Sequence, residues 1–206
     1  LDLAKVGKWD FVITEIGGTV GDIESLPYIE AVRQLKWDLG KRAMVVHLTL
    51  IPYLAASGEL KTKPTQHSVK KLLEYGLQPD VLVCRAEHKV PQDLRRKIAQ
   101  FCNVDPKAVV ASLDAESIYD VPLLMMEEKL DAVVLEKFGM KVGPNPELKD
   151  WKLFLKHLKT PKKTVKIGLV GKYVELKDSY KSIAESFIHA GAANDCKVEL
   201  EWIHSE

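Results

Sequence analysis

The sequence predicts an α/β protein in which a mostly parallel sheet is flanked by helices. Short apolar runs rich in β-branched residues alternate with longer stretches in which apolar residues recur at helical spacing. Strands separated by helices are typical of parallel sheets with right-handed crossovers. The apolar fraction of 46% is enough for a packed core, and 206 residues correspond to one large domain or to one domain and part of another.

The first strands and the first helix are predicted from local signals. Phe11 opens an apolar run that predicts a strand over residues 11–16. Ser25 suits a helix N-cap and Pro27 suits the first turn. The apolar residues that follow at helical spacing are Tyr28, Ile29, Val32 and Leu35. Residues 44–51 are rich in β-branched side chains and predict a second strand.

The same alternation continues beyond residue 51. Gly76 is expected to follow the end of a helix, because glycine is the preferred residue directly after a helix end. The elements predicted here are, in order, a polar loop at 57–66, a helix at 67–75, a strand at 80–84, a helix at 91–101, a strand at 109–113 and a longer helical segment at 121–138.

The pattern changes near Gly139. Residues 143–146 read Gly-Pro-Asn-Pro, a cluster that breaks regular structure, and a lysine-rich stretch follows that we interpret as a solvated face. Residues 139–163 are therefore predicted to be a linker with one helix. A strand at 165–170, a helix at 180–190 and a strand at 197–203 predict the opening of a second α/β domain.

Composition excludes several classes of protein. With 30 basic and 29 acidic residues the net charge is +1, so neither a nucleic acid nor a membrane surface is an expected partner. Cys84, Cys102 and Cys196 are far apart and form no C-x-x-C motif, which indicates a reducing, cytoplasmic setting. The chain begins with Leu rather than Met, so we expect it to be a piece of a longer protein.

The segment Glu15-Ile-Gly-Gly-Thr-Val-Gly-Asp-Ile-Glu-Ser25 is the most informative motif. It follows a predicted strand and precedes a predicted helix, at the sheet edge where ligands of α/β proteins bind. Its glycines let a ligand approach the backbone closely, and a carboxylate placed there could hold Mg²⁺. The alternative is a glycine-rich turn with solvated acids.

A second motif is Lys61-Thr-Lys-Pro-Thr-Gln66. Two lysines, two hydroxyls and an amide precede a predicted helix whose N-terminal amides carry partial positive charge, which suits a triphosphate. We expect Asp22 and Glu24 to lie beside this loop, where they could bind a sugar or base or share a Mg²⁺ ion. The alternative is an ordinary exposed loop.

Other reactive residues are better explained by packing. Residues 17–21 do not form a Walker A loop, because no Lys-Ser/Thr pair follows. Cys84 and Cys102 are predicted to be core residues rather than nucleophiles, and His47, within a strand, is predicted to be a hydrogen-bonded core histidine. His67, beside the basic loop, is left open as a ligand contact.

Taken together, these motifs resemble the CTP synthase family. The resemblance runs in order through nearly the whole chain. The further motifs that carry it are His47-Leu-Thr-Leu50, Ala55-Ala-Ser-Gly58, Phe101-Cys-Asn-Val104, Ser117-Ile-Tyr119 and Val170-Gly-Lys-Tyr173.

The resemblance implies an architecture and a reaction. Residues 1–138 would be the C-terminal part of a P-loop-type amidoligase (synthetase) domain, 139–163 the linker, and 164–206 the start of a class I glutamine amidotransferase domain. The reaction implied is the ATP-dependent amination of UTP to CTP with glutamine or ammonia, through a 4-phosphorylated UTP. It further implies Mg²⁺, GTP as an allosteric activator, feedback by CTP, and a homotetramer.

The resemblance also assigns roles to individual residues. Glu15 matches a Mg²⁺ ligand, and Leu113, Asp114 and Ala115 match a stretch that lines the adenine of ATP. The residues that match UTP or CTP contacts are Asp22, Ile23, Glu24, Lys61, Thr62, Lys63, Pro64, Thr65, Gln66 and Lys97. The family's Gly-Lys-Gly loop, its second metal-binding aspartate and its amidotransferase nucleophile have no counterpart here, so we expect the chain alone to be inactive.

Two alternatives stay open at this point. The chain could be a non-catalytic nucleotide-binding or assembly piece. It could also be part of another P-loop amidoligase, similar to dethiobiotin synthetase, although such an enzyme would not be expected to carry the motif at 61–66.

Overall fold

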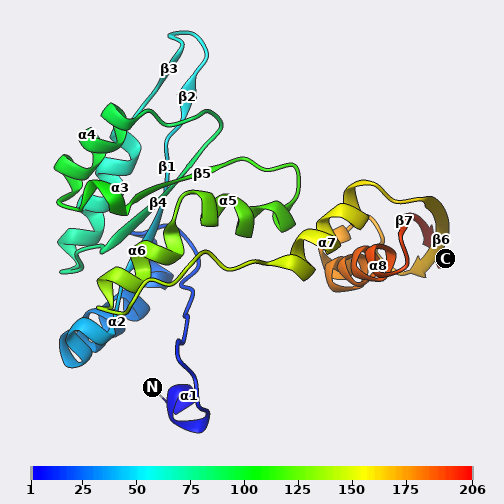
Figure 1. Ribbon diagram of the computed structural model, residues 1–206, viewed down its shortest axis with the longest axis horizontal. Coiled ribbons are helices and arrows are strands. Elements are labelled where there is room, and N and C mark those ends of the chain that lie inside the picture. Colours follow the sequence, from blue (N-terminus) through cyan, green and yellow to red (C-terminus); the bar gives the residue numbers. More distant parts are fainter. Residues whose placement is uncertain (1, 206) are drawn as a thin grey trace. The chain divides into compact units, whose positions relative to one another are not determined.

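The structure, a computed structural model, describes residues 2–205 apart from the side chains of Leu3 and Ala4, and it divides into two compact units at Gly143 and Pro144 (Figure 1). The helices of the first unit are α1 (Asp2–Val6), α2 (Leu26–Leu39), α3 (Lys63–Glu74), α4 (Gln92–Cys102), α5 (Val121–Glu127) and α6 (Leu130–Lys137). Its strands are β1 (Val46–Leu50), β2 (Tyr53–Leu54), β3 (Glu59–Leu60), β4 (Val81–Ala86) and β5 (Val109–Leu113). Its 3₁₀ helices are η1 (Ile23–Ser25), η2 (Gly40–Arg42), η3 (Pro106–Ala108) and η4 (Ile118–Asp120).

The first unit is a three-layer α/β structure, as predicted. Its parallel sheet has the order β1-β4-β5, with helices α3 and α4 on one face and α5 and α6 on the other (Figure 1). Leu82 and Cys84 of β4 pack with Val69 of α3 and Ile98 of α4. The intervening Val83 packs on the opposite side of the sheet, in the cluster that includes α6.

The outer strand β1 is covered on one face only. His47 and Thr49 are buried, whereas Leu48 is 72% exposed. The alternation follows from strand geometry, because successive side chains point to opposite faces. In contrast, β4 lies between two strands, and both of its faces are covered by helices.

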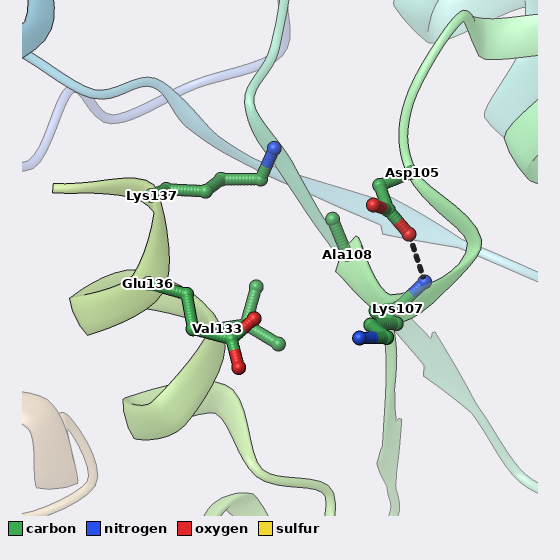
Figure 2. A pocket seen from close by; sticks show the side chains of 6 residues that line it. All are labelled: Asp105, Lys107, Ala108, Val133, Glu136 and Lys137. Atoms are coloured by element: carbon green, nitrogen blue, oxygen red, sulfur yellow. Dashed lines mark hydrogen bonds between the residues drawn. The ribbon is translucent and has the colours of Figure 1, made fainter. Parts of the chain in front are cut away.

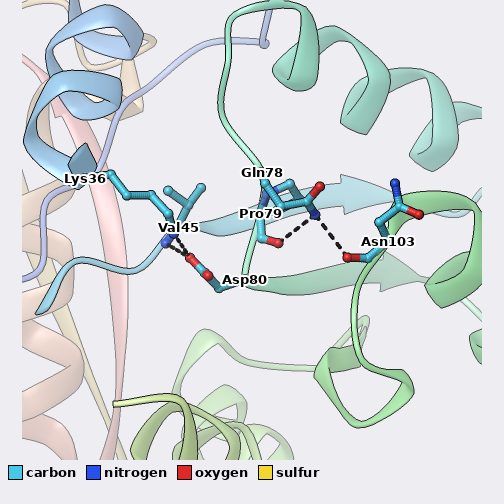
Figure 3. A network of polar contacts seen from close by, with 6 residues as sticks. All are labelled: Lys36, Val45, Gln78, Pro79, Asp80 and Asn103. Carbon is cyan, nitrogen blue, oxygen red and sulfur yellow. Dashed lines mark hydrogen bonds and ion pairs between the residues drawn. The ribbon is translucent and has the colours of Figure 1, made fainter. Parts of the chain in front are cut away.

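Two polar side chains before β4 fasten the helices to the sheet (Figure 3). Asp80 accepts a hydrogen bond from the amide of Val45 at 2.8 Å. It also forms an ion pair with Lys36, near the end of α2. Gln78 donates to the carbonyl oxygens of Cys102 (3.1 Å) and Asn103 (3.3 Å) at the end of α4. The C-terminal ends of α2 and α4 are therefore held at one short segment of chain.

Most predicted elements are confirmed, and three are corrected. Residues 11–16 are extended but form no strand within the described chain, and Ile13 is 94% exposed. An apolar run favours a strand but does not supply the neighbour with which it must pair. Helix α3 begins at Lys63, so the end of the predicted polar loop is helical. The helical segment at 121–138 is broken at Lys129, whose φ of 60° lies outside the helical region.

The second unit contains α7 (Lys149–Lys159), β6 (Lys163–Gly171), the 3₁₀ helix η5 (Lys177–Tyr180), α8 (Lys181–Ala193) and β7 (Cys196–His204). Strands β6 and β7 are parallel, and α8 connects them. Helix α7 packs on α8 through stacking of Phe154 on His189, with ring centroids 5.2 Å apart. The predicted strand–helix–strand pattern is thus confirmed.

A helix that crosses a membrane needs about 20 mostly apolar residues. Within residues 2–205, every helix is too short or too polar for that.

Candidate functional site

The loops that follow the three parallel strands all lie at one edge of the sheet. Leu50, Ala86 and Leu113 are the last residues of β1, β4 and β5. In open α/β sheets, ligands bind at this carboxyl edge. Helices α3 and α4 begin there, because each follows a strand and returns along the face of the sheet.

The basic helix start, defined as residues 61–66, forms the first turn of α3 and the two residues before it. Thr62 is the N-cap residue, but its hydroxyl accepts a hydrogen bond from Gln66 Nε2 at 3.0 Å instead of capping an amide. Pro64 has no amide hydrogen. The amide of the exposed Lys63 is thus left at the positive end of the helix without a capping side chain, which is favourable for an anion.

Buried hydroxyl groups fix this helix start to the sheet. Thr65 is fully buried, and its hydroxyl lies 3.0 Å from the carbonyl oxygen of Leu50 and 3.1 Å from Thr49 Oγ1. One turn further along, Ser68 Oγ lies 2.8 Å from His47 Nε2, and burial lowers the pKa of His47. The predicted core role of His47 is confirmed.

Cationic side chains gather around the helix start. Lys61 forms an ion pair with Glu59, and this contact is the main cause that lowers the pKa of Glu59. The charge of Lys97, on α4, also lowers the pKa of Glu59, so Lys97 lies near the short antiparallel pair of strands β2 and β3 that contains Glu59. Lys61 and Lys97 are therefore both near Glu59, and Lys63 is exposed in the first turn of α3, whereas the side chains of Thr65 and Gln66 are buried.

The residues at 113–115 lie where β5 ends. Leu113 packs on the core, and Asp114 and Ala115 are exposed. Asp114 Oδ1 accepts a hydrogen bond from Arg85 Nε at 2.9 Å, and Arg85 is largely exposed. We did not single out Arg85 from the sequence. A charged residue inside the apolar strand 81–86 was the available signal.

The acidic segment, defined as residues 15–24, is a local turn. Asp22 Oδ2 accepts a hydrogen bond from the amide of Thr19 at 2.8 Å, and this ties the segment to itself. Gly18 and Gly21 have φ angles of 79° and 115°, in a region that side chains other than glycine rarely adopt. Glu15 and Glu24 are exposed.

The acidic segment contacts α3 at a different position along the helix axis from the basic helix start. A Cβ atom added to Gly21 would lie 3.5 Å from Lys71 Cε, so the acidic turn rests beside that part of the helix. Lys63 and Lys71 are eight residues apart, or about 12 Å along a helix axis. The described hydrogen bonds of Asp22 join it to Thr19 and Ser25, within its own turn. The expectation that Asp22 and Glu24 bind a ligand beside residues 61–66 stays a prediction.

The metal assignment depends on Glu15. No cluster of three or more acidic, histidine or cysteine side chains forms a metal site among the described residues. Mg²⁺ nevertheless fits a single carboxylate, because it is commonly bound by one or two carboxylates together with phosphate oxygens and water. Glu15, exposed on the acidic segment, has the right donor chemistry.

Two surface hollows lie away from these residues. One, of about 420 Å³, is lined by Arg33, Gln34, Trp37 and Asp38 of α2. The other, of about 200 Å³, lies between α6 and the turn before β5 (Figure 2). Its charged side chains include Asp105, which accepts a hydrogen bond from the amide of Lys107 at 2.8 Å. It adjoins the beginning of β5 rather than its carboxyl end.

Comparison with protein families matches residues 2–140 to the family described as the CTP synthase N-terminus. Relatives named CTP synthase include proteins of Flavobacterium johnsoniae (64% identical over 205 residues), Cytophaga hutchinsonii (62% over 205) and Porphyromonas gingivalis strain W83 (56% over 204). Each alignment covers 99% of this chain and 38% of the relative, so the chain spans less than half the length of these proteins.

Proposed function

The chain belongs to the CTP synthase family, and on that premise we propose that it forms part of an enzyme that aminates UTP to CTP. ATP phosphorylates the 4-oxygen of the uracil and leaves as ADP. Ammonia, supplied as such or released from glutamine, then attacks carbon 4, and inorganic phosphate departs. The family match favours this assignment over a dethiobiotin-synthetase-like enzyme.

The observation that carries the proposal is the basic helix start at the carboxyl edge of the sheet. Lys61 and Lys97 lie near Glu59, Lys63 is exposed in the first turn of α3, and the amide of Lys63 has no capping side chain. Together these positive groups suit the triphosphate of UTP or of the product CTP. Thr62, Thr65 and Gln66 act chiefly by holding this helix start in place, because their side chains are buried. Pro64 contributes the fixed backbone of the first turn.

Residues outside the helix start complete the assignment. Asp22, Ile23 and Glu24 contact the pyrimidine nucleotide, and Leu113, Asp114 and Ala115 line the adenine of ATP. Arg85, paired with Asp114, adds a cation at the same place. Glu15 holds Mg²⁺, which neutralises phosphate charge when bound. Positioning of the two nucleotides and electrostatic stabilisation supply most of the catalysis in phosphoryl transfer.

The remaining assignments concern the whole protein. Residues 1–138 belong to the synthetase domain, 139–163 to the linker and 164–206 to the start of the glutamine amidotransferase domain. The parallel β6–α8–β7 unit supports the last of these, because it is a suitable opening for an α/β domain. The protein works in the cytoplasm as a homotetramer, with GTP as an activator.

The test is turnover by the full-length protein. UTP that carries a heavy-oxygen label at position 4 should give CTP together with labelled inorganic phosphate when ATP, Mg²⁺ and ammonia are supplied. Amination without label in the phosphate would overturn the phosphorylated intermediate. Tight binding of UTP and ATP without any CTP would favour the non-catalytic alternative.

A further inference from the structure

An ion pair at the outer edge of the sheet has no place in the chemistry above. Arg95 on α4 and Glu128 at the end of α5 face each other, with Arg95 Nη2 2.8 Å from Glu128 Oε1 and Nη1 bonded to Oε2. The side chains are only 14% and 25% exposed. Burial alone would raise the pKa of Glu128, but hydrogen bonds from Arg95 and from a backbone amide lower it, so the carboxylate is charged.

The same carboxylate closes the free edge of β5. Glu128 Oε2 accepts a hydrogen bond from the amide of Ala111 at 3.1 Å. Within the described chain, β5 pairs with β4 alone, so this amide would otherwise point away from the sheet. Lys129, with its φ of 60°, turns the chain between α5 and α6, and Glu128 lies directly before it. The contact lies two residues before Leu113.

The pair links elements from opposite faces of the sheet. Helix α4 lies on one face of the sheet and α5 on the other (Figure 1). Glu128 contacts both Arg95 of α4 and the amide of Ala111 in the edge strand β5. Arg95 Nε also donates to the carbonyl oxygen of Val90 at 3.2 Å, just before α4 begins. Since Gln78 holds the other end of α4, this helix is fixed at both ends (Figure 3).

Both candidate nucleotide subsites are attached to this frame. Lys97 lies two residues after Arg95 on α4, and Leu113 lies two residues after Ala111 on β5. We propose that Arg95 and Glu128 are positioning residues that set the separation between the pyrimidine triphosphate subsite and the adenine subsite. The inference rests on the proposed function, because it takes Lys97 and residues 113–115 as contacts of two different nucleotides.

Positioning makes a specific prediction about binding and turnover. Each nucleotide contacts its own subsite, so loss of the charge pair should leave the binding of either nucleotide alone nearly unchanged. Phosphoryl transfer requires both nucleotides at the correct separation, and a displacement of about 1 Å can slow a reaction about a hundredfold. The rate constant kcat should therefore fall while the separate dissociation constants do not.

The experiment compares Glu128→Gln with Glu127→Gln in the full-length enzyme. Glu127 is the exposed neighbour, so both substitutions remove one negative charge at the same corner. We expect Glu128→Gln to lower kcat with ammonia about ten- to a hundredfold, with calorimetric Kd values for UTP and for ATP within about twofold of wild type. Glu127→Gln should match the wild type.

Two further measurements separate positioning from general loss of structure. The double variant Arg95→Met/Glu128→Gln should be no slower than Arg95→Met alone, because residues that act as one unit are not additive. Equal loss of kcat and of both affinities, together with a lower melting temperature, would overturn the inference in favour of a structural role. So would a normal kcat for Glu128→Gln. If the wild-type enzyme forms no CTP, the proposed function fails instead.

Discussion

The basic helix start and the acidic segment carry complementary charges but are built in opposite ways. In the helix start, Thr62, Thr65 and Gln66 are buried and hydrogen-bonded, whereas Lys63 and Pro64 are exposed and Lys61 is half-buried. In the acidic segment, Thr19 and Asp22 are joined by two hydrogen bonds, one from the amide of Thr19 to the Asp22 carboxylate and one from the amide of Asp22 to the Thr19 carbonyl oxygen, and Glu15 is exposed. The basic helix start is thus preorganised by the sheet, whereas the acidic segment is shaped by its own turn.

The largest expected effect tests the exposed side of this comparison. We predict that Glu15→Ala in the full-length enzyme abolishes CTP formation from ammonia as well as from glutamine, because the metal ligand serves the shared phosphoryl-transfer step. The loss should exceed about a hundredfold. Asp10→Ala, an exposed acid shortly before the segment, is the control. Activity with ammonia that survives Glu15→Ala would remove Glu15 from the metal site.

The same substitution in the two regions sharpens the difference in their construction. Thr65→Val keeps the shape of the side chain but removes the hydroxyl that bonds Leu50, so it should destabilise the protein by about 1–3 kcal/mol. Thr19→Val changes an exposed side chain and should cost less than about 0.5 kcal/mol. Denaturant unfolding measures both. Equal values would mean that the basic helix start is not held by its buried hydroxyl.

A third prediction concerns the lysines at the helix start. Lys61→Ala should weaken UTP and CTP binding about tenfold and ATP binding much less, because one phosphate contact is lost. Lys70→Ala, which removes an exposed lysine further along α3, is the matched control. Calorimetric titration of each nucleotide into the full-length protein gives the values. Equal weakening for all three nucleotides would contradict the triphosphate assignment.

The smallest expected effect is a dependence of stability on pH. Burial lowers the folded-state pKa of His47, so the unfolded chain takes up its proton first as pH falls from the ordinary value of 6.5. The contribution of His47 to stability is therefore complete above that pH and declines as pH falls through the lower folded-state pKa. His47→Gln should flatten this slope in unfolding measurements, and His67→Gln, at an exposed position, should not. A slope that His47→Gln leaves intact would assign it to other groups.

The sequence predicted the interior of the first unit well because its signals are local. Residues 109–113 form a strand within the predicted bounds. A short apolar run between turns is typical of a strand in a parallel sheet whose two faces are covered by helices. The helix start was placed four residues late because Lys63 and Pro64 read as a polar loop, although proline is favoured in a first helical turn.

The failures share a physical cause, which is dependence on distant residues. Residues 11–16 have strand composition, but a strand exists only when another strand accepts its hydrogen bonds. The break at Lys129 places Glu128 against Arg95, 33 residues away. No pattern in the neighbouring sequence predicts a contact between residues so far apart. The proximity of Lys97 to Glu59 likewise results from packing of α4 beside α3.

Helix α3 is the shared support of both charged regions, and this has a practical consequence for spectroscopy. Its first turn carries the basic helix start, and Val20 and Gly21 of the acidic segment rest against Leu72 and Lys71. A helix of this length moves as one rod, so a shift at its first turn is transmitted to its far end. A fluorophore or spin label at the exposed position 70 would therefore report binding at the proposed triphosphate contacts of the first turn from a position outside the proposed site.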